Sequence, residues 1–307
     1  MRLINIQILA LLIFTITSSQ LLYADVKKQQ ASDWSLTTCP APTIDSRKIL
    51  SLDNAKLEEI SFKGCHDNLI KAYLVSPLSK KTKNHPAILY VHWYEPHSNN
   101  SNRDEFLNEA KDMAQQGVMS LLVSTFWSVP DGSYQQRRWQ NDYTNTLHQT
   151  QDLLHAINLL RSFTNEVDTT RIAYVGHDYG ATFGAIVAGI DTKIKGFVLE
   201  AGTPRITEWY MYGSASGVPS GEDAKQYLDS FKAIEPDAMI SKTKSQVLLQ
   251  YSLNDQYIST ERVQDMKKAA PKNTVLKTYN TTHAMDLPQV ISDRREWLMQ
   301  LLNLKTP

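Results

Sequence analysis

The stretch "VDTTRIAYVGHDYGATFGAIVAG", residues 167–189, decides the fold, because it predicts a strand, a tight turn and a helix in immediate succession. Its first half ends in an apolar run of strand type, and its second half is rich in small and apolar residues. Gly176 and Gly180 flank the turn, where a strand and a helix meet too closely for side chains. We therefore expect Asp178, which lies between them, on a strained and exposed turn.

The rest of the chain alternates short apolar runs with amphipathic stretches, which is the pattern of helices that cross over a mostly parallel sheet. Helical spacing of apolar residues follows Asp104 and covers 143–160 and 290–302. The sequence therefore predicts an α/β fold with an eight-stranded sheet flanked by helices, in one domain over residues 56–307. The predicted strands are one near Ile60 and the runs 69–75, 87–91, 118–123, 171–175, 196–199, 246–251 and 274–279.

Residues 203–245 interrupt this alternation after the sixth predicted strand, and they are too many for a plain connection. Aromatic side chains are frequent in this segment, which contains Trp209, Tyr210, Tyr212 and Tyr227. We expect a small cap-like insertion that covers a pocket. An ordinary helix with a long surface loop is the alternative.

The N-terminus has the features of an export signal over residues 1–24, with Arg2, an apolar run, polar residues and a cleavage site after Ala24. An uncleaved anchor is the alternative, and both place the remainder of the chain outside the cytoplasm. We expect a periplasmic or secreted protein without stable membrane insertion after signal cleavage. Residues 25–55 are mixed and polar, and we expect them to form an N-terminal arm.

Cysteine content and charge limit the classes of partner. Cys39 and Cys65 are the only cysteines, and an oxidising compartment predicts a disulfide between them. Lys plus Arg and Asp plus Glu each total 32, so no basic surplus attracts nucleic acid. His148, Asp152 and His155 share a spacing that metal ligands use, but a solvated helix face explains them at least as well. We predict a small-molecule substrate with no metal and no cofactor, and no oligomeric state is indicated.

Three segments resemble the α/β-hydrolase family. The turn "GHDYG", residues 176–180, resembles the nucleophile elbow of that family. "VLLQYSLNDQYIS" places Asp255 just beyond a strand and "LKTYNTTHAMD" places His283 after the next one, which is similar to dienelactone hydrolases and prolyl-oligopeptidase-type hydrolases. The resemblance implies the catalytic residues Asp178, Asp255 and His283 in the chain order of this fold. Glu200, which ends the strand before the insertion, is the alternative acid, as in some haloalkane dehalogenases.

An aspartate at the elbow changes the expected reaction. A serine hydroxyl needs a base before it can attack, whereas a carboxylate is ordinarily ionised at neutral pH. Against an ester, a carboxylate would form a reactive mixed anhydride, but against a saturated carbon with a leaving group it forms a stable alkyl ester. In this respect the elbow is similar to that of haloalkane dehalogenases and epoxide hydrolases.

This resemblance implies that Asp178 attacks carbon and that His283 then deprotonates the water that hydrolyses the alkyl-enzyme ester. The backbone N–H groups of Tyr179 and of Trp93, in the "HWYEP" loop, are expected to hold the oxyanion. His177 is expected to be a structural part of the elbow. The candidate pocket-lining residues are Tyr94, Trp127, Trp209, Tyr210 and Tyr212.

Several residues depart from the two families with an aspartate nucleophile. Trp93 stands where they usually have glycine after histidine, Tyr179 stands where dehalogenases often have a halide-binding tryptophan, and the insertion is small. The remainder of the chain looks more like the dienelactone hydrolase branch. Two alternatives therefore stay open: a carboxylic-ester or lactone hydrolase of dienelactone type, and a catalytically silent hydrolase-like binding protein.

Overall fold

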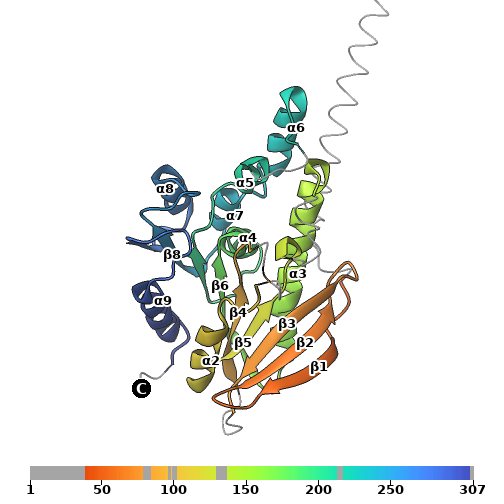
Figure 1. The fold of residues 1–307 in the computed structure, drawn as a ribbon, viewed down its shortest axis with the longest axis vertical. Helices are drawn as coiled ribbons and strands as arrows, with labels where there is room; N and C mark the ends of the chain where they lie inside the picture. The colour runs from red at the N-terminus through yellow and green to blue at the C-terminus, as the bar shows by residue number, and fades with distance from the viewer. Residues whose placement is uncertain are drawn as a thin grey trace, which may run out of the picture. The chain divides into compact units, whose positions relative to one another are not determined.

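Among the described residues, nine strands form one sheet in the order β1-β2-β3-β5-β4-β6-β7-β8-β9 (Figure 1). This computed structural model describes residues 39–78, 84–95, 98, 102–128, 137–212 and 217–304. The strands are β1 (Ile44–Ser51), β2 (Lys56–Lys63), β3 (Leu69–Ser76), β4 (His85–Val91), β5 (Met119–Val123), β6 (Val167–His177), β7 (Gly196–Glu200), β8 (Gln246–Ser252) and β9 (Val275–Tyr279).

Helices alternate with these strands after β4. The α-helices are α2 (Leu107–Gln115), α3 (Asp142–Ser162), α4 (Tyr179–Ala188), α5 (Ile206–Tyr212), α6 (Gly221–Phe231), α7 (Pro236–Ile240), α8 (Thr260–Ala269) and α9 (Pro288–Leu301). Two short 3-10 turns, η2 (Phe126–Ser128) and η4 (Trp139–Asn141), lie between β5 and α3. The alternation of strand and helix is what the sequence pattern predicts for a parallel sheet.

The strand order contains a switch point at β4. Strands β1, β2 and β3 pair antiparallel, and so do β3 and β5, whereas the neighbours from β5 to β9 pair in parallel. The chain passes from β4 to β5 on one side and later to β6 on the other side. In open α/β sheets, ligands bind outside the carboxyl ends of the strands at such a point. The fold therefore favours a site formed by the loops after β4 and β6.

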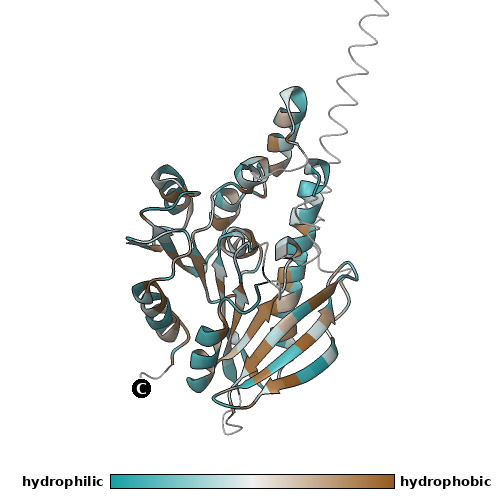
Figure 2. Cartoon of the chain, in the orientation of Figure 1, coloured by the Kyte–Doolittle hydropathy of each residue, from teal (hydrophilic) through white to brown (hydrophobic). Residues whose placement is uncertain are grey.

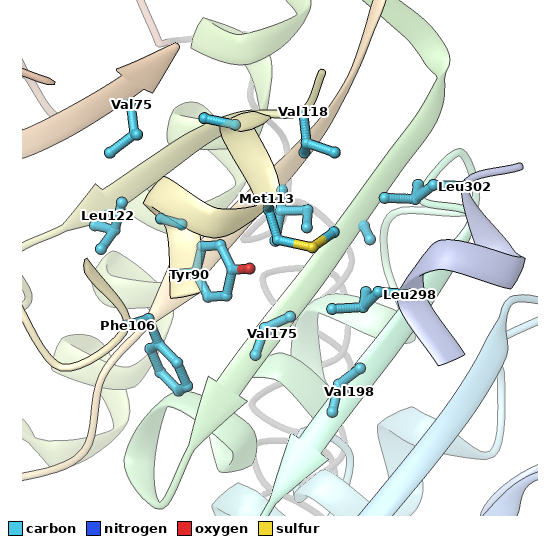
Figure 3. Packing of buried hydrophobic residues seen from close by; sticks show 14 of the residues in the cluster. Val75, Tyr90, Phe106, Met113, Val118, Leu122, Val175, Val198, Leu298 and Leu302 are labelled. Atoms are coloured by element: carbon cyan, nitrogen blue, oxygen red, sulfur yellow. The ribbon is translucent and has the colours of Figure 1, made fainter. Parts of the chain in front are cut away.

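Helices cover both faces of the parallel part of the sheet, so β4, β5 and β7 are buried along their whole length. On one face, α2 and α9 enclose an apolar cluster that includes Met113, Leu298 and the strand residues Val175 and Val198 (Figure 3). On the other face, α3 and α4 pack on β6, and α7 packs on α4. Figure 2 shows hydrophobic residues concentrated along the strands.

The predicted α/β fold, with a mostly parallel sheet flanked by helices, is confirmed, and all eight predicted strands are present. The prediction that residues 25–55 form an arm is wrong for β1, which pairs antiparallel with β2 as the edge strand. The predicted disulfide between Cys39 and Cys65 is present.

Residues 203–245 hold α5, α6 and α7. The insertion is anchored to α3, because the Tyr227 hydroxyl donates a hydrogen bond of 2.9 Å to Asp142. The predicted export signal, residues 1–24, lies outside the described residues. In the part of the chain that the structure describes, no helix has the length and apolar character needed to cross a membrane.

Candidate active site

Asp178 lies at the tip of a tight turn between β6 and α4. Its φ is 55°, in the left-handed region that costs a non-glycine residue about 1–3 kcal/mol. A Cβ atom at Gly176 would overlap the carbonyl of Gly180, and one at Gly180 would overlap the carbonyl of Val91. The turn is further fixed because the Asp178 N–H donates to the Glu200 carbonyl at 2.8 Å. The two glycines are therefore required by the close approach of strand, turn and helix.

The structure brings Asp178, His283 and Asp255 together at the carboxyl ends of three strands. Asp255 follows β8 and His283 follows β9. Nδ1 of His283 lies 2.8 Å from Oδ2 of Asp255, and its Nε2 lies 3.4 Å from Oδ1 of Asp178. Asp178 and His283 are only 7% and 6% exposed, so both ionisable groups are largely removed from water. The imidazole is thus held between two carboxylates.

Asp255 is an anion with every oxygen engaged. Its Oδ1 accepts hydrogen bonds from the backbone N–H groups of Tyr257 and Ile258, at 2.8 and 2.9 Å. Burial opposes ionisation, but the hydrogen bonds and the attraction to His283 outweigh burial and hold the pKa of Asp255 below its ordinary value. Asp255 is therefore a fixed negative charge that orients His283 through Nδ1.

The two carboxylates beside His283 favour its protonated form. Burial disfavours the charged ring, but the hydrogen bonds and charges of Asp178 and Asp255 outweigh it and raise the pKa of His283 to about 10. The ring edge of Tyr257 lies against it with centroids 4.9 Å apart. A protonated histidine cannot accept a further proton, so His283 can act as a base only after it has released this one.

The backbone donor to Asp178 is Tyr94 and not Trp93. The Tyr94 N–H donates to Oδ2 of Asp178 at 2.9 Å, whereas the Trp93 N–H donates to Oε2 of Glu105 at 2.7 Å. The prediction for Trp93 is therefore wrong, because successive N–H groups of an extended loop point in opposite directions. Tyr179 begins α4 directly after Asp178, and its role as a second donor stays a prediction.

Glu200, the alternative acid, does not contact His283. Its carboxylate forms an ion pair of 2.6 Å with Arg294, and Arg294 also pairs with Glu109 at 2.6 Å. Burial raises the pKa of Glu200, and Arg294 opposes this. Glu200 therefore belongs to a buried charge network beneath the turn, and of the two candidate acids Asp255 is the one that contacts His283.

The predicted pocket-lining residues separate into two groups. Trp209 on α5 lies 4.8 Å from the Tyr179 ring and 6.4 Å from the His283 ring, and Tyr94 contacts Tyr179 at 6.1 Å. Trp127 is buried and stacks on the Tyr179 ring with centroids 5.5 Å apart, and the Tyr210 ring lies 6.4 Å from the same ring. These four side chains surround Tyr179, the residue directly after Asp178, whereas Tyr212 is 83% exposed to solvent.

The three α3 residues with metal-ligand spacing do not converge on one point. Asp152 accepts hydrogen bonds from the Asn68 side chain and the Cys65 backbone, and His148 stacks on His66. His155 is buried beside the disulfide sulfur atoms. Because both sulfur atoms are joined in the disulfide, this group offers no thiolate ligand.

Sequence reasoning missed Glu105 and the full role of His177. Glu105 lies in the turn before α2, and its carboxylate contacts both Trp93 and His177. His177 is 2% exposed and also hydrogen-bonds the backbone carbonyl of His283 at 2.9 Å. No local motif marks Glu105, because its partners follow strands β4 and β6 and are distant in sequence.

Comparison with known proteins places this geometry in a fold class. No protein-family model matches the chain, and no curated protein matches it significantly. Acetyl xylan esterase 1 from Thermoanaerobacterium sp. aligns with a TM-score of 0.71 at 16% identity, over 90% of this chain and 93% of that one. An acetyl xylan esterase from Paenibacillus sp. R4 gives 0.69 at 16% identity, over 91% and 93%.

A protein from Klebsiella pneumoniae described as a dienelactone hydrolase gives a TM-score of 0.55 at 14% identity, over 77% of this chain and 93% of that one. These solved structures have the α/β-hydrolase fold, and the chain described here has that fold too. At such low identity the likeness establishes the fold and leaves the substrate to be argued from the site.

Proposed function

We propose that the chain is a hydrolase whose nucleophile is the Asp178 carboxylate, acting on a saturated carbon with a leaving group of haloalkane or epoxide type. The observation that carries the proposal is the placement of the two Asp178 oxygens. Oδ2 accepts the Tyr94 N–H at 2.9 Å, and Oδ1 lies 3.4 Å from Nε2 of His283. In a serine hydrolase, the oxyanion donors hold the carbonyl oxygen of the substrate ester. Here Oδ2 of Asp178 itself lies on such a donor.

The first step uses Oδ1, the less tightly held oxygen. Oδ1 forms a bond to the substrate carbon, and the leaving group departs with the electrons of the broken bond. The product is an alkyl ester of Asp178, whose carbonyl oxygen Oδ2 remains on the Tyr94 N–H. Because the charge of Asp178 has been consumed, His283 keeps only Asp255 as a counterion, and we expect its pKa to fall. His283 then releases its proton to solvent or, when the substrate is an epoxide, to the alkoxide that ring opening leaves on the same molecule.

The second step hydrolyses this ester. Neutral His283 takes a proton from water, and the water oxygen attacks Cγ of Asp178. Negative charge develops on Oδ2, where the Tyr94 N–H is already placed to stabilise it. When the intermediate collapses, the alkoxide leaves and takes the proton from His283, and Asp178 is left as a carboxylic acid. The acid proton passes to His283, which restores the Asp178 carboxylate and the protonated ring. A substrate R–X and water thus give R–OH and HX, and an epoxide and water give a diol.

Oxygen-18 labelling tests this mechanism directly. A single turnover in oxygen-18 water, with a terminal epoxide or a 1-haloalkane as substrate, should place the heavy oxygen in the peptide that contains Asp178. The variant His283→Gln should accumulate the alkyl ester, which intact mass spectrometry detects, and Asp178→Ala serves as the control without a nucleophile. Turnover without label in Asp178 would refute the covalent mechanism.

An acyl-ester hydrolase is the second candidate, and it is supported by the esterases among the fold neighbours. In that case p-nitrophenyl acetate should be hydrolysed by the unmodified chain without labelling of Asp178. The variant Asp178→Ser tests the remaining machinery, since new esterase activity requires a working His283 and Asp255. Failure of the chain on every ester and alkyl substrate would favour a binding protein with the hydrolase fold.

We also propose that the chain is exported and acts there on a small molecule. The disulfide between Cys39 and Cys65 supports this, because disulfides persist in oxidising compartments. Expression of the full chain in a bacterial host, followed by fractionation and N-terminal sequencing, should show a mature protein that begins after Ala24. Retention of residues 1–24, or recovery in the cytoplasm, would contradict the proposal.

A further inference from the structure

Three loops carry the candidate active site, and one carboxylate connects them. The oxyanion loop (residues 92–95) follows β4, the elbow (176–180) joins the end of β6 to the start of α4, and the histidine loop (280–286) follows β9. We propose that Glu105 and His177 form a positioning pair that holds these three loops in register. The inference rests on the proposed function for its catalytic consequence, but its structural part stands on contacts that need no substrate.

Glu105 bridges the oxyanion loop and the elbow. Its Oε2 accepts the Trp93 N–H at 2.7 Å, and its Oε1 lies 2.6 Å from Nδ1 of His177. The Trp93 N–H is the one directly before the N–H of Tyr94, which donates to Asp178. Glu105 therefore holds the chain directly before the peptide group that carries this donor, and Nδ1 of His92 donates to the carbonyl of that peptide group, the Trp93 oxygen, at 2.7 Å.

His177 continues the connection to the histidine loop. Its Nε2 lies 2.9 Å from the backbone carbonyl of His283, which can only accept a hydrogen bond. Nε2 therefore carries a proton, and a second proton is shared between Nδ1 and Glu105. Burial disfavours the charged ring, but Glu105, followed by Glu200, outweighs burial and the opposing charge of His283 and raises the pKa of His177.

Packing makes this connection rigid. The Trp93 and His177 rings stack with centroids 5.2 Å apart and an interplanar angle of 12°. His177 is 2% exposed, and the Glu105 side chain is 18% exposed, so water competes weakly for their hydrogen bonds. Loss of Glu105 would leave the Trp93 N–H and Nδ1 of His177 without their acceptor, while the stack alone would not set their direction.

Two variants separate hydrogen bonding from charge. In Glu105→Gln the amide oxygen can still accept the Trp93 N–H, and the amide NH₂ can donate to Nδ1 of a neutral His177, whose Nε2–H still reaches His283. Glu105→Ala removes both contacts. The matched control is Asp104→Ala, which removes an exposed carboxylate at the adjacent position.

Amide hydrogen exchange on the full chain is the first measurement. Glu105→Ala should speed exchange at Trp93 and Tyr94 and over residues 281–285 by about tenfold or more. Exchange in β8 should not change, and Glu105→Gln and Asp104→Ala should match the unmodified chain. If the exchange rates of these loops are the same in Glu105→Ala as in the unmodified chain, the positioning pair is overturned. It is also overturned if exchange accelerates equally throughout the chain.

Kinetics with the first substrate found to be active are the second measurement. Glu105→Ala should lower kcat by about 10²-fold with little change in KM, because misplaced groups lose transition-state contacts. Glu105→Gln should restore most of kcat. If exchange rises locally while kcat is unchanged, the catalytic part of the inference is overturned. If exchange rises and no substrate is ever turned over, the proposed function fails while the positioning pair is supported.

Discussion

Replacement of Asp178 by asparagine is expected to lower the pKa of His283. In the unmodified protein the ring lies between Asp178 and Asp255, at 3.4 and 2.8 Å, and its pKa is raised to about 10. Asparagine has nearly the same shape, and its carbonyl oxygen can still accept the Tyr94 N–H. The substitution therefore removes one negative charge with little change of geometry, as formation of the proposed ester would.

The size of the shift follows from the geometry of the pair. An opposite charge within this distance typically moves a pKa by about 1–3 units, which corresponds to about 1.4–4 kcal/mol. We therefore expect His283 in Asp178→Asn to titrate at about pH 7–9. At pH 7 the neutral fraction of His283 is then about one half at the lower end of this range and about 1% at the upper end.

The same shift changes the pH dependence of stability. The pKa of His283 is higher in the folded than in the unfolded chain, so its contribution is complete below about pH 6.5 and is lost as the pH rises towards about 10. In Asp178→Asn the contribution is smaller, and its loss ends at a lower pH. The free energies of unfolding of the two proteins should therefore differ most near pH 6 and converge above about pH 10.

NMR titration of the His283 ring, together with urea unfolding between pH 6 and 10.5, measures both effects. The control is Asp286→Asn, which removes an exposed charge three residues from His283 and should leave its pKa close to that of the unmodified protein. A His283 ring that titrates near 6.5 in the unmodified protein would refute the reasoning. So would a titration midpoint that is the same in Asp178→Asn.

Four further predictions concern the acid, the oxyanion donor, the pH profile and the disulfide. Asp255→Asn should lower kcat by about 10³–10⁴-fold, because His283 loses its orienting partner, whereas Glu200→Gln should change kcat far less. If steady-state kinetics show the larger loss of kcat in Glu200→Gln, Glu200 is the acid instead. Tyr94→Pro should lower kcat by about 10²–10³-fold and Tyr94→Ala much less, since only proline removes the N–H; equal losses would assign the role to the ring. With an alkyl substrate, kcat should rise with pH through about 7–9, where His283 of the alkyl-enzyme ester becomes neutral, and then level off, while direct hydrolysis of an ester should accelerate only as the pH rises towards 10. Because Cys39 and Cys65 are separated by 26 positions, replacing both by alanine should lower the free energy of unfolding by about 3.5 kcal/mol, and an unchanged urea midpoint would contradict this.

The sequence predicts those strands whose burial leaves a pattern. Strands β4, β5 and β7 are covered on both faces and therefore appear as continuous apolar runs. Strand β1 is mostly exposed and contains polar residues such as Ser46 and Lys48, so no hydrophobic period marks it. Its position depends on the hydrogen-bond ladder with β2, which local sequence does not determine.

The candidate site divides in the same way. Asp178, Asp255 and His283 each follow a predicted strand, and the carboxyl ends of parallel strands meet at one edge of the sheet. Their meeting could therefore be predicted, although their catalytic roles stay a prediction. The choice between the N–H groups of Trp93 and Tyr94 depends on the direction of one peptide group. That direction depends on Glu105, which accepts the Trp93 N–H, and on His92, whose Nδ1 lies 2.7 Å from the Trp93 carbonyl. No motif connects Glu105 to the loop.

The charges around His283 explain how an aspartate can serve at an elbow where serine is ordinary. Serine needs a neutral histidine in the first step, but here Asp178 and Asp255 keep His283 protonated at rest. The first step of the proposed mechanism therefore uses a nucleophile that needs no base, and an ionised carboxylate satisfies this condition. A base is needed only for hydrolysis of the ester, after Asp178 has lost its charge and no longer holds the proton on His283. Formation of the ester thus prepares its own hydrolysis, whereas direct attack of water on an acyl ester would meet a histidine that is still protonated.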